Sequence, residues 1–480
     1  MKLLKCMVLA SAALPLCAQE AAVTAEAENP KTLQWNAGGD FRARQEIYDR
    51  LPGANGNVSK YNSFFRMRGR AWGEVKNEDF RLYLRLTDEF REYARDPGHT
   101  YGRTPGELIL DNLYLDLNNL FWDRVDLRVG RQDLWYGSGR VIAEGTPMDG
   151  SRSFFSDAVK AIVKFDEKNT LDIFGLYNSP KTFSWGNPNP ISGGEDLPLN
   201  CIEPWSTGMA EWGGGLYFKS KELDALPFDL YYIYAQKSTY HLLNGTKMQG
   251  RTVNTAGVRV MPQITDTLSA ELEAATQYGE KDSGATIGGQ MGYAGLTYKM
   301  QPLDEASRLR PYSTLAVLYM SGDRDRGTGR MGDTKSDRSW DPLWGRYTFL
   351  ESEMYVYRGI YGVAYWSNIV YPSLKIGCEW FNERGGKHDI FTSVGPMFVA
   401  TKDRNPSTGN PMGGGDGCLY GWFLRARYDF PLLTGFVKVS ENKKRGNLLG
   451  HVTAELLEPG DYCASSKLAY FLRWEVSVAF

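Results

Sequence analysis

The sequence of 480 residues contains no long apolar run and little histidine or cysteine. No segment reaches the roughly 18–20 consecutive apolar residues of a membrane-spanning helix, which excludes a helical membrane protein. The net charge is -2, so the chain lacks the basic surplus that a nucleic-acid partner usually requires. Intrinsic disorder is excluded as well, because aromatic residues make up 13% of the chain and its net charge is small.

Cysteine is scarce, and its spacing favours neither a metal site nor a disulfide scaffold. Of the 6 cysteines, Cys6 and Cys17 lie in an apolar leader, and no CxxC pair occurs, so no zinc site is predicted. The remaining four are too few to form a disulfide scaffold in so long a chain. An exported protein can still pair some of them. The pairing we consider joins Cys418 or Cys201 to Cys463, since all three lie in or near large predicted loops.

The chain also lacks the residue patterns of common hydrolases. No GxSxG motif occurs, and the 4 histidines are scattered over loops and separate strands, so we expect no enzyme. These histidines are His99, His241, His388 and His451. Asp323, Asp325 and Gly327 resemble part of a calcium loop, but ligands at the later positions are missing. We therefore expect no cofactor, with a loop calcium ion as the open alternative.

The first 22 residues have the features of a secretory signal peptide. Lys2 and Lys5 precede a mostly apolar stretch that ends in small residues, which predicts cleavage after Ala18 or Ala22. The stretch around Cys17 resembles a lipoprotein signal, but the bulky Leu16 before the cysteine fits that reading poorly. We divide the chain into a signal peptide (1–18), an N-terminal periplasmic segment (19–32) and one large domain (33–480).

Strict alternation of apolar and polar residues dominates this large domain. In residues 33–47, Phe41 and Ala43 share one parity with other apolar residues, while Arg42 and Arg44 fall on the opposite parity. Residues 61–76, 80–91 and 467–480 repeat the pattern. A period of two indicates strands with one apolar and one polar face.

Two folds could use such strands. A soluble sandwich would turn the charged faces to water, but such sandwiches rarely carry long strands over so many residues without a domain break. The inverted arrangement turns apolar residues to lipid and charged residues to a water-filled lumen. Backbone groups in lipid must be paired, so such a sheet has to close. We therefore predict an all-β fold, a transmembrane antiparallel β-barrel in the outer membrane of a Gram-negative-type bacterium.

The connections support this prediction, because short periplasmic turns and long extracellular loops are typical of such barrels. We count about 18 strands, an even number that leaves both termini on the short-turn side. The predicted strands span 33–48, 61–76, 80–92, 108–118, 124–134, 154–165, 170–178, 209–219, 228–238, 251–261, 267–279, 289–299, 310–321, 354–366, 373–382, 419–430, 447–457 and 467–480. The region 389–401 is an alternative strand inside the loop 383–418.

Several stretches resemble the alginate-export family of outer-membrane channels. They are Gly39–Arg44, Arg66–Arg70, Leu127–Gln132 followed by Tyr136, Gly137 and Arg140, Asp149–Phe154, Ser321–Asp323, Gly450–His451 and Glu458–Tyr462. The resemblance implies an 18-stranded monomeric barrel that passes a solute passively, in the founding cases an anionic polysaccharide. It does not fix the substrate, because the family name covers many members of unknown substrate. Phe480, which ends the last strand on its apolar parity, resembles the signal read by the outer-membrane assembly machinery.

The inward parity carries the residues that we predict to line the pore and bind substrate. The bases are Arg42, Arg44, Arg66, Arg68, Arg70, Arg81, Arg85, Arg128, Lys160, Arg425, Arg427 and Arg473, and the acids are Asp40, Glu74, Asp126 and Glu475. The simplest register of the first hairpin sets Arg44 opposite Arg66, Arg42 opposite Arg68, and Asp40 opposite Arg70. Like charges directly opposite destabilise a sheet. Such a ladder therefore favours an anion-selective constriction whose low-dielectric walls focus the field.

Four features of this lumen stay open. The arginines could instead brace the wall through salt bridges, and Trp72 and Tyr83 could stack on sugar rings. The loop 135–153 could fold inward, and the turn 431–446 could cover the periplasmic mouth or be a solvated loop. The function we expect is the passive, anion-selective passage of a solute such as an acidic polysaccharide or oligosaccharide. A general diffusion porin and a structural or adhesive barrel are the alternatives. The expected partners are outer-membrane lipid, the anionic solute and the assembly machinery.

Overall fold

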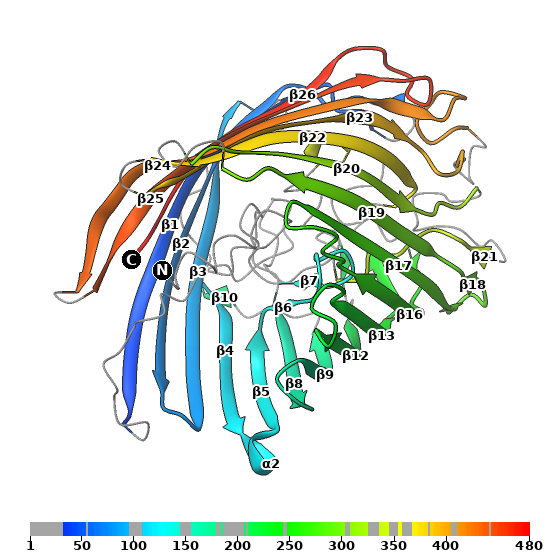
Figure 1. Cartoon of the computed structure of the whole chain (residues 1–480). Coiled ribbons are helices and arrows are strands. Elements are labelled where there is room, and N and C mark those ends of the chain that lie inside the picture. Colours follow the sequence, from blue (N-terminus) through cyan, green and yellow to red (C-terminus); the bar gives the residue numbers. More distant parts are fainter. Residues whose placement is uncertain are drawn as a thin grey trace.

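The chain forms a closed antiparallel β-barrel of 18 strands (Figure 1). The computed structural model describes residues 32–53, 56–95, 108–144, 155–178, 184–185, 206–207, 210–242, 247–302, 308–324, 336–344, 354–357, 367–382, 385–404, 410–440 and 443–480. Closure is direct, since the first strand pairs with both the second and the last. The predicted signal peptide (1–18) and all but the last residue of the predicted periplasmic segment (19–32) lie outside the described residues.

The barrel strands follow one another around the ring in chain order. They are β1 (Gln34–Asp49), β2 (Asn62–Lys76), β3 (Phe80–Arg95), β4 (Leu108–Asn119), β5 (Val125–Gln132), β8 (Ser156–Lys164), β9 (Asn169–Asn178), β12 (Glu211–Ser220), β13 (Phe228–Lys237), β16 (Arg251–Val260), β17 (Leu268–Lys281), β19 (Gln290–Lys299), β20 (Arg310–Met320), β22 (Ile369–Phe381), β23 (Lys387–Phe398), β24 (Leu419–Ser440), β25 (Lys443–Pro459) and β26 (Ala469–Ala479). In Figure 1 they curve around a broad interior.

The remaining elements are short and lie in the connections. They are α2 (Leu120–Asp123), β6 (Leu134–Trp135), β7 (Ala143–Glu144), β10 (Ser184–Trp185), β11 (Ser206–Thr207), β14 (Tyr240–Leu242), β15 (Lys247–Met248), β18 (Thr286–Ile287), β21 (Ser336–Asp337) and η2 (Tyr355–Tyr357). α2 is a tight turn rather than a true helix, since Phe121 and Trp122 have left-handed backbone angles. Within the described ranges, no helix has the length and apolar character to span a membrane.

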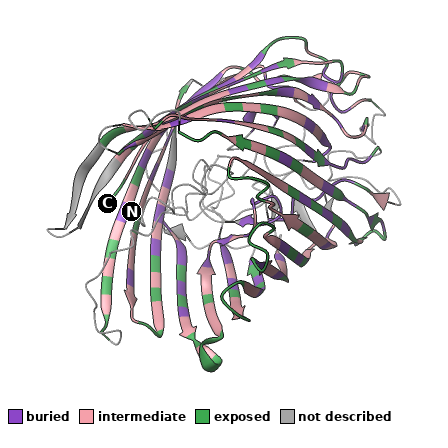
Figure 2. Ribbon diagram, in the orientation of Figure 1, coloured by how far each residue is buried: buried purple, intermediate pink, exposed green. Residues whose placement is uncertain are grey.

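The two parities of each strand lie in different environments, as Figure 2 shows by the alternation of buried and exposed residues along the strands. Outward side chains such as Val129, Ile173 and Leu315 are exposed, although they are apolar. Exposed aromatics flank this apolar band at both ends. Trp35, Trp122, Phe165 and Phe480 lie toward the short turns, and Tyr177, Tyr278, Tyr319 and Trp422 toward the long loops. An apolar band between two aromatic girdles is the exterior of a bilayer-spanning barrel.

The predicted register of the first hairpin is confirmed. Arg44 pairs with Arg66, Arg42 with Arg68, and Asp40 with Arg70. At the closure seam, β26 sets Arg473 opposite Glu46 and Glu475 opposite Arg44. Strong alternation therefore located both the strands and their inward faces correctly in this part of the barrel.

The predicted strand 354–366 is wrong. Residues 355–357 form η2 instead, and Tyr355, Val356 and Tyr357 are all buried, whereas a barrel strand would bury only alternate residues. Residues 358–366 lie outside the described residues. The open alternative at 389–401 proves to be a barrel strand, β23, which pairs with β22 and β24. These two differences cancel, so the predicted count of about 18 strands is correct.

The segment 431–446 is not a long turn. β24 continues to Ser440 and β25 begins at Lys443, so the two strands pair beyond the point where the turn was predicted. The ladder changes register between Pro431 and Leu433 and again before Val437. Proline cannot donate a ladder hydrogen bond, and a shift of register accommodates it without ending the strands. The backbone of this segment therefore gives no support to a cover over the periplasmic mouth.

Candidate functional site: the lumen wall

A dense ion-pair network lines the inner wall where the barrel closes, across β1, β2, β3 and β26. Glu46 lies 2.7 Å from Arg44 and 2.9 Å from Arg473, measured between carboxylate oxygen and guanidinium nitrogen. Glu89 lies 2.9 Å from Arg66 and 3.3 Å from Arg42. The network joins six bases to four acids, namely Arg42, Arg44, Arg66, Arg68, Arg70 and Arg473 with Asp40, Glu46, Glu89 and Glu475.

The arginines of this network have almost no exposed surface. Arg44 is 0% exposed and Arg68 is 4% exposed, with Arg42, Arg66 and Arg473 between them. Tyr355 of η2 packs beside the seam, with its ring 3.9 Å from that of Phe471 and 5.8 Å from that of Tyr48. Paired and covered in this way, the guanidinium groups brace the wall. Among these ten described residues, the bases outnumber the acids by two.

Arg68 and Arg70 show where this surplus lies. Both approach the same carboxylate, since Arg70 Nε lies 2.7 Å and Arg68 Nη2 3.8 Å from an Asp40 oxygen. Arg42 stands directly opposite Arg68 on β1. Like charges across a strand pair cost stability. At this point of the wall, Arg68 and Arg70 thus share the Asp40 carboxylate.

A second group of predicted residues lies on β2, β3 and β4. Arg81 donates to Glu74 at 2.7 Å, and Arg85 binds Asp111 at 2.9 Å and Asp133 at 3.0 Å. The aromatic rings here pack against one another. Tyr83 stacks between Trp72 at 6.1 Å and Tyr114 at 5.1 Å, as centroid distances. The Tyr83 ring thus packs between two aromatic neighbours on the inner wall, and stacking of Trp72 and Tyr83 on sugar rings stays a prediction.

A third group, around Arg128 on β5 and Lys160 on β8, is more accessible. Arg128 binds Asp116 with two nitrogens, at 2.6 and 2.9 Å, and its side chain is 26% exposed. Lys160 stands directly opposite Arg128. Asp126 pairs with Lys164 at 2.7 Å. The structure therefore places the predicted bases in separate groups rather than in one continuous ladder.

Arg425 and Arg427 lie on another part of the ring, on the inner face of β24. Arg427 binds Asp429 of the same strand at 2.6 Å. The Arg425 guanidinium lies 5.5 Å from the centre of the Phe391 ring, and Lys375 Nζ lies 4.3 Å from the same ring. Phe391 is thus an inward aromatic residue with two cations close to it.

Part of the loop after β5 folds into the lumen, as predicted for the range 135–153. Arg140 binds Glu271 at 2.8 Å and Glu273 at 2.6 Å, and its guanidinium lies 3.6 Å from the centre of the Tyr293 ring. Burial alone would lower the pKa of Arg140, but the two carboxylates outweigh it and raise that pKa above its ordinary value. Residues 145–154, including Arg152, lie outside the described residues.

Glycine makes this inward loop possible. Gly137 and Gly139 have φ of 55° and 77°, the left-handed region that favours glycine. A Cβ on Gly137 would also lie 2.9 Å from the Tyr217 hydroxyl. Tyr136 stacks 4.5 Å from Tyr217, and burial followed by the nearby Asp172 carboxylate raises the pKa of its phenol well above the ordinary value.

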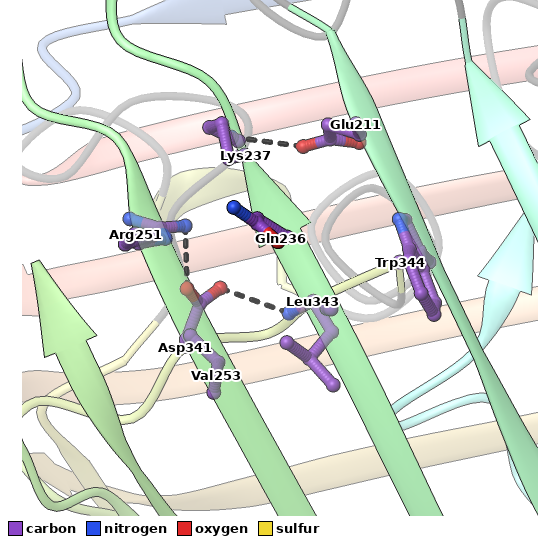
Figure 3. Close-up of a pocket in the computed structure, with 9 residues that line it drawn as sticks. Glu211, Gln236, Lys237, Arg251, Val253, Asp341, Leu343 and Trp344 are labelled. Atoms are coloured by element: carbon purple, nitrogen blue, oxygen red, sulfur yellow. Dashed lines mark hydrogen bonds and ion pairs between the residues drawn. The ribbon is translucent and has the colours of Figure 1, made fainter.

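Residues 336–344 form a second inward segment on the same wall, shown in Figure 3. Asp341 lies 2.5 Å from Arg251 of β16 and accepts a hydrogen bond from the Leu343 amide. Glu211 and Lys237, from β12 and β13, pair beside it at 3.0 Å. A parallel bridge joins Ile142 to Trp344. The two inward segments are therefore docked on each other and on the wall.

Sequence reasoning did not select several lumen residues. Glu89 and Lys219 lie on inward parities of predicted strands, so the alternation could have identified them. Arg140 lies in a loop, where no periodicity shows direction. Its contact with Glu271 and Glu273 joins residues more than 130 positions apart and could not be read locally.

The other predicted sites have clear positions. Cys418 and Cys463 are free thiols, so the predicted pairing with Cys463 is wrong; Cys463 is buried with its Sγ 3.4 Å from the Tyr420 carbonyl, whereas Cys418 is exposed. Cys201, Asp325 and Gly327 lie outside the described residues. Asp323 accepts a hydrogen bond from the Arg338 amide. In the described part of the chain, no group of three or more His, Cys, Asp or Glu residues could hold a metal ion.

The closed barrel with its lipid-facing exterior defines the chain as an outer-membrane β-barrel protein. No family model and no curated protein matches it. Among solved structures, it is similar to the outer-membrane porin OccAB1 of Acinetobacter baumannii, with a TM-score of 0.50 and 12% identity over 92% of this chain and 96% of that one. It is also similar to OccK11 (OpdR) of Pseudomonas aeruginosa, with a TM-score of 0.48 and 11% identity over 93% and 96% of the two chains.

Proposed function

We propose that the protein is a passive outer-membrane channel that prefers anionic solutes, such as an acidic saccharide. The observation that carries this proposal is the base surplus of the closure-seam network, six bases to four acids. A positive wall in a low-dielectric channel raises the local concentration of anions. The resemblance of the sequence to the alginate-export family points to the same class of solute.

The accessible bases add to this field. Arg128 and Lys219 have side chains that are 26% and 43% exposed, and both lie on inward parities. Anionic groups can therefore approach them from the lumen. A monomeric state and recognition of the last strand by the assembly machinery are parts of the same proposal, supported by the family resemblance and by Phe480.

Planar-bilayer recording of the refolded protein in a potassium chloride gradient tests the proposal. We expect a reversal potential that reports a preference for chloride. Changing Arg42, Arg44, Arg66 and Arg68 to serine should reduce or reverse that preference, because it leaves Glu46, Glu89 and Glu475 with fewer partners. Arg131→Ser is a control variant, since Arg131 lies on the face of β5 opposite to Arg128 and pairs with Asp157 of β8.

Three results would separate the alternatives. A folded protein without conductance would indicate a structural or adhesive barrel. Conductance without anion preference would indicate a general diffusion porin. Cation preference in the unmodified protein, or a preference that the four substitutions leave unchanged, would contradict the role given to the network.

A further inference from the structure

Lys160 occupies an unusual position on the inner wall. It stands directly opposite Arg128 on the neighbouring strand β5, where two like charges destabilise the sheet. Its outward neighbour Val159 is exposed and Ala158 is buried, which fixes Lys160 on the lumen side. In the described chain, no ion pair or hydrogen bond engages its ammonium group.

The acids near Lys160 are already bound to other bases. The charged groups that act on Lys160 are Arg128, Asp172, Lys219 and Asp116. Asp116 receives both of its short contacts from Arg128, at 2.6 and 2.9 Å. Asp172 binds Lys219 at 3.0 Å. Lys160 therefore lies near two ion pairs, Arg128–Asp116 and Lys219–Asp172, and its own positive charge is in excess of these paired charges.

The neighbouring aromatics shape one side of this position. Phe174 of β9 stands directly opposite Lys160, and it stacks 5.3 Å from Tyr136 of the inward loop. Lys219 Nζ lies 5.4 Å from the centre of the Tyr136 ring. The three cations thus border a wall of packed rings, where a bound anion would be partly shielded from water and its attraction strengthened.

We propose that Lys160, flanked by Arg128 and Lys219, is a carboxylate-binding subsite for a uronate-containing saccharide. This inference rests on the proposed function and adds to it a specific contact point. Lys160 is the central residue of β8, four residues from either end, and Lys219 is one residue from the end of β12 at a short turn. The subsite therefore extends from the middle of the barrel wall toward its short-turn end.

Current block by trigalacturonate tests the subsite, with uncharged maltotriose as the reference sugar. In the unmodified channel, we expect trigalacturonate to interrupt the chloride current more strongly than maltotriose does. Lys160→Met should raise the half-blocking concentration about fivefold, the equivalent of about 1 kcal/mol for one partly screened charge contact. Titration calorimetry in detergent should show the same loss of affinity independently of conduction.

Lys164→Met is the matched control, because it removes the same charge from the same face of β8 but from a lysine paired with Asp126. It should leave the block nearly unchanged. Equal weakening by both variants would overturn the subsite in favour of a general field effect. A chloride-selective channel that trigalacturonate neither blocks nor binds would also overturn it and leave the proposed function intact. Absence of anion preference would contradict the proposed function, while calorimetry would still decide the subsite.

Discussion

At the scale of single residues, the closure seam depends on carboxylates that each serve several arginines. Glu46 is 0% exposed and lies within 3.6 Å of Arg66 as well as close to Arg44 and Arg473. Desolvating these charges is costly, so the network is stable only while its members compensate one another. The stability of the barrel should therefore be most sensitive to the loss of one of the acids of this network, because they are fewer than the bases.

Glu46→Gln tests this sensitivity, because it keeps the shape of the side chain and removes its charge. Breaking a buried ion pair costs about 3–5 kcal/mol, so the free energy of unfolding in urea should fall by roughly that amount. Asp224→Asn is the control, since Asp224 is 91% exposed and its change should stay within about 0.5 kcal/mol. Equal stability of Glu46→Gln and the unmodified protein would show that the pairs are not required.

The free thiols give a second residue-scale prediction. Burial, followed by the nearby Asp461 carboxylate, raises the pKa of Cys463 to about 12. The thiolate is the reactive form, so Cys463 should stay unmodified at pH 7.5. Cys418 is exposed and should react with iodoacetamide in the folded protein. Peptide mass mapping under non-reducing conditions should show Cys463 labelled only after unfolding, and a linked Cys418–Cys463 peptide would contradict this result.

At the scale of elements, the sequence predicted strands well wherever apolar and charged residues alternated. The first hairpin and its inward arginines follow from that pattern. The pattern did not distinguish residues 354–357, whose apolar side chains bury against the lumen wall, from a lipid-facing strand. An apolar side chain can be buried against lipid or against other protein residues, and the sequence does not distinguish the two environments. An inward loop in a barrel can therefore resemble a transmembrane strand.

The inward loop at 134–144 is an element whose position depends on distant contacts. Arg140→Met would remove the cation between Glu271 and Glu273. We expect the loop to loosen from the wall, which should raise single-channel conductance and current noise and weaken anion preference. Ser138→Ala removes only the hydroxyl bonded to Glu271 and should change these quantities less. Unchanged conductance in a folded Arg140→Met barrel would show that this loop does not narrow the passage.

At the scale of the whole molecule, the net charge of -2 conceals how the charges are arranged. The described lumen holds bases that exceed the acids at the seam and around Lys160, while the outer surface between the girdles is apolar. Composition could not show this, because it sums over both faces of every strand. The parity of each strand and the closure of the barrel are needed to separate the faces.

A field that arises from the whole wall has a measurable signature in its dependence on salt. The Debye length falls from about 10 Å at 0.1 M to about 3 Å at 1 M ionic strength, so mobile ions should screen the lumen charges over that range. We expect the chloride preference measured by reversal potential to decrease steadily as potassium chloride rises from 0.1 to 1 M. Arg131→Ser should follow the same curve as the unmodified protein, since its charge lies on the other face of β5. A preference that persists undiminished at 1 M would instead require contacts close enough to escape screening, and the long-range field of the seam would then not be its source.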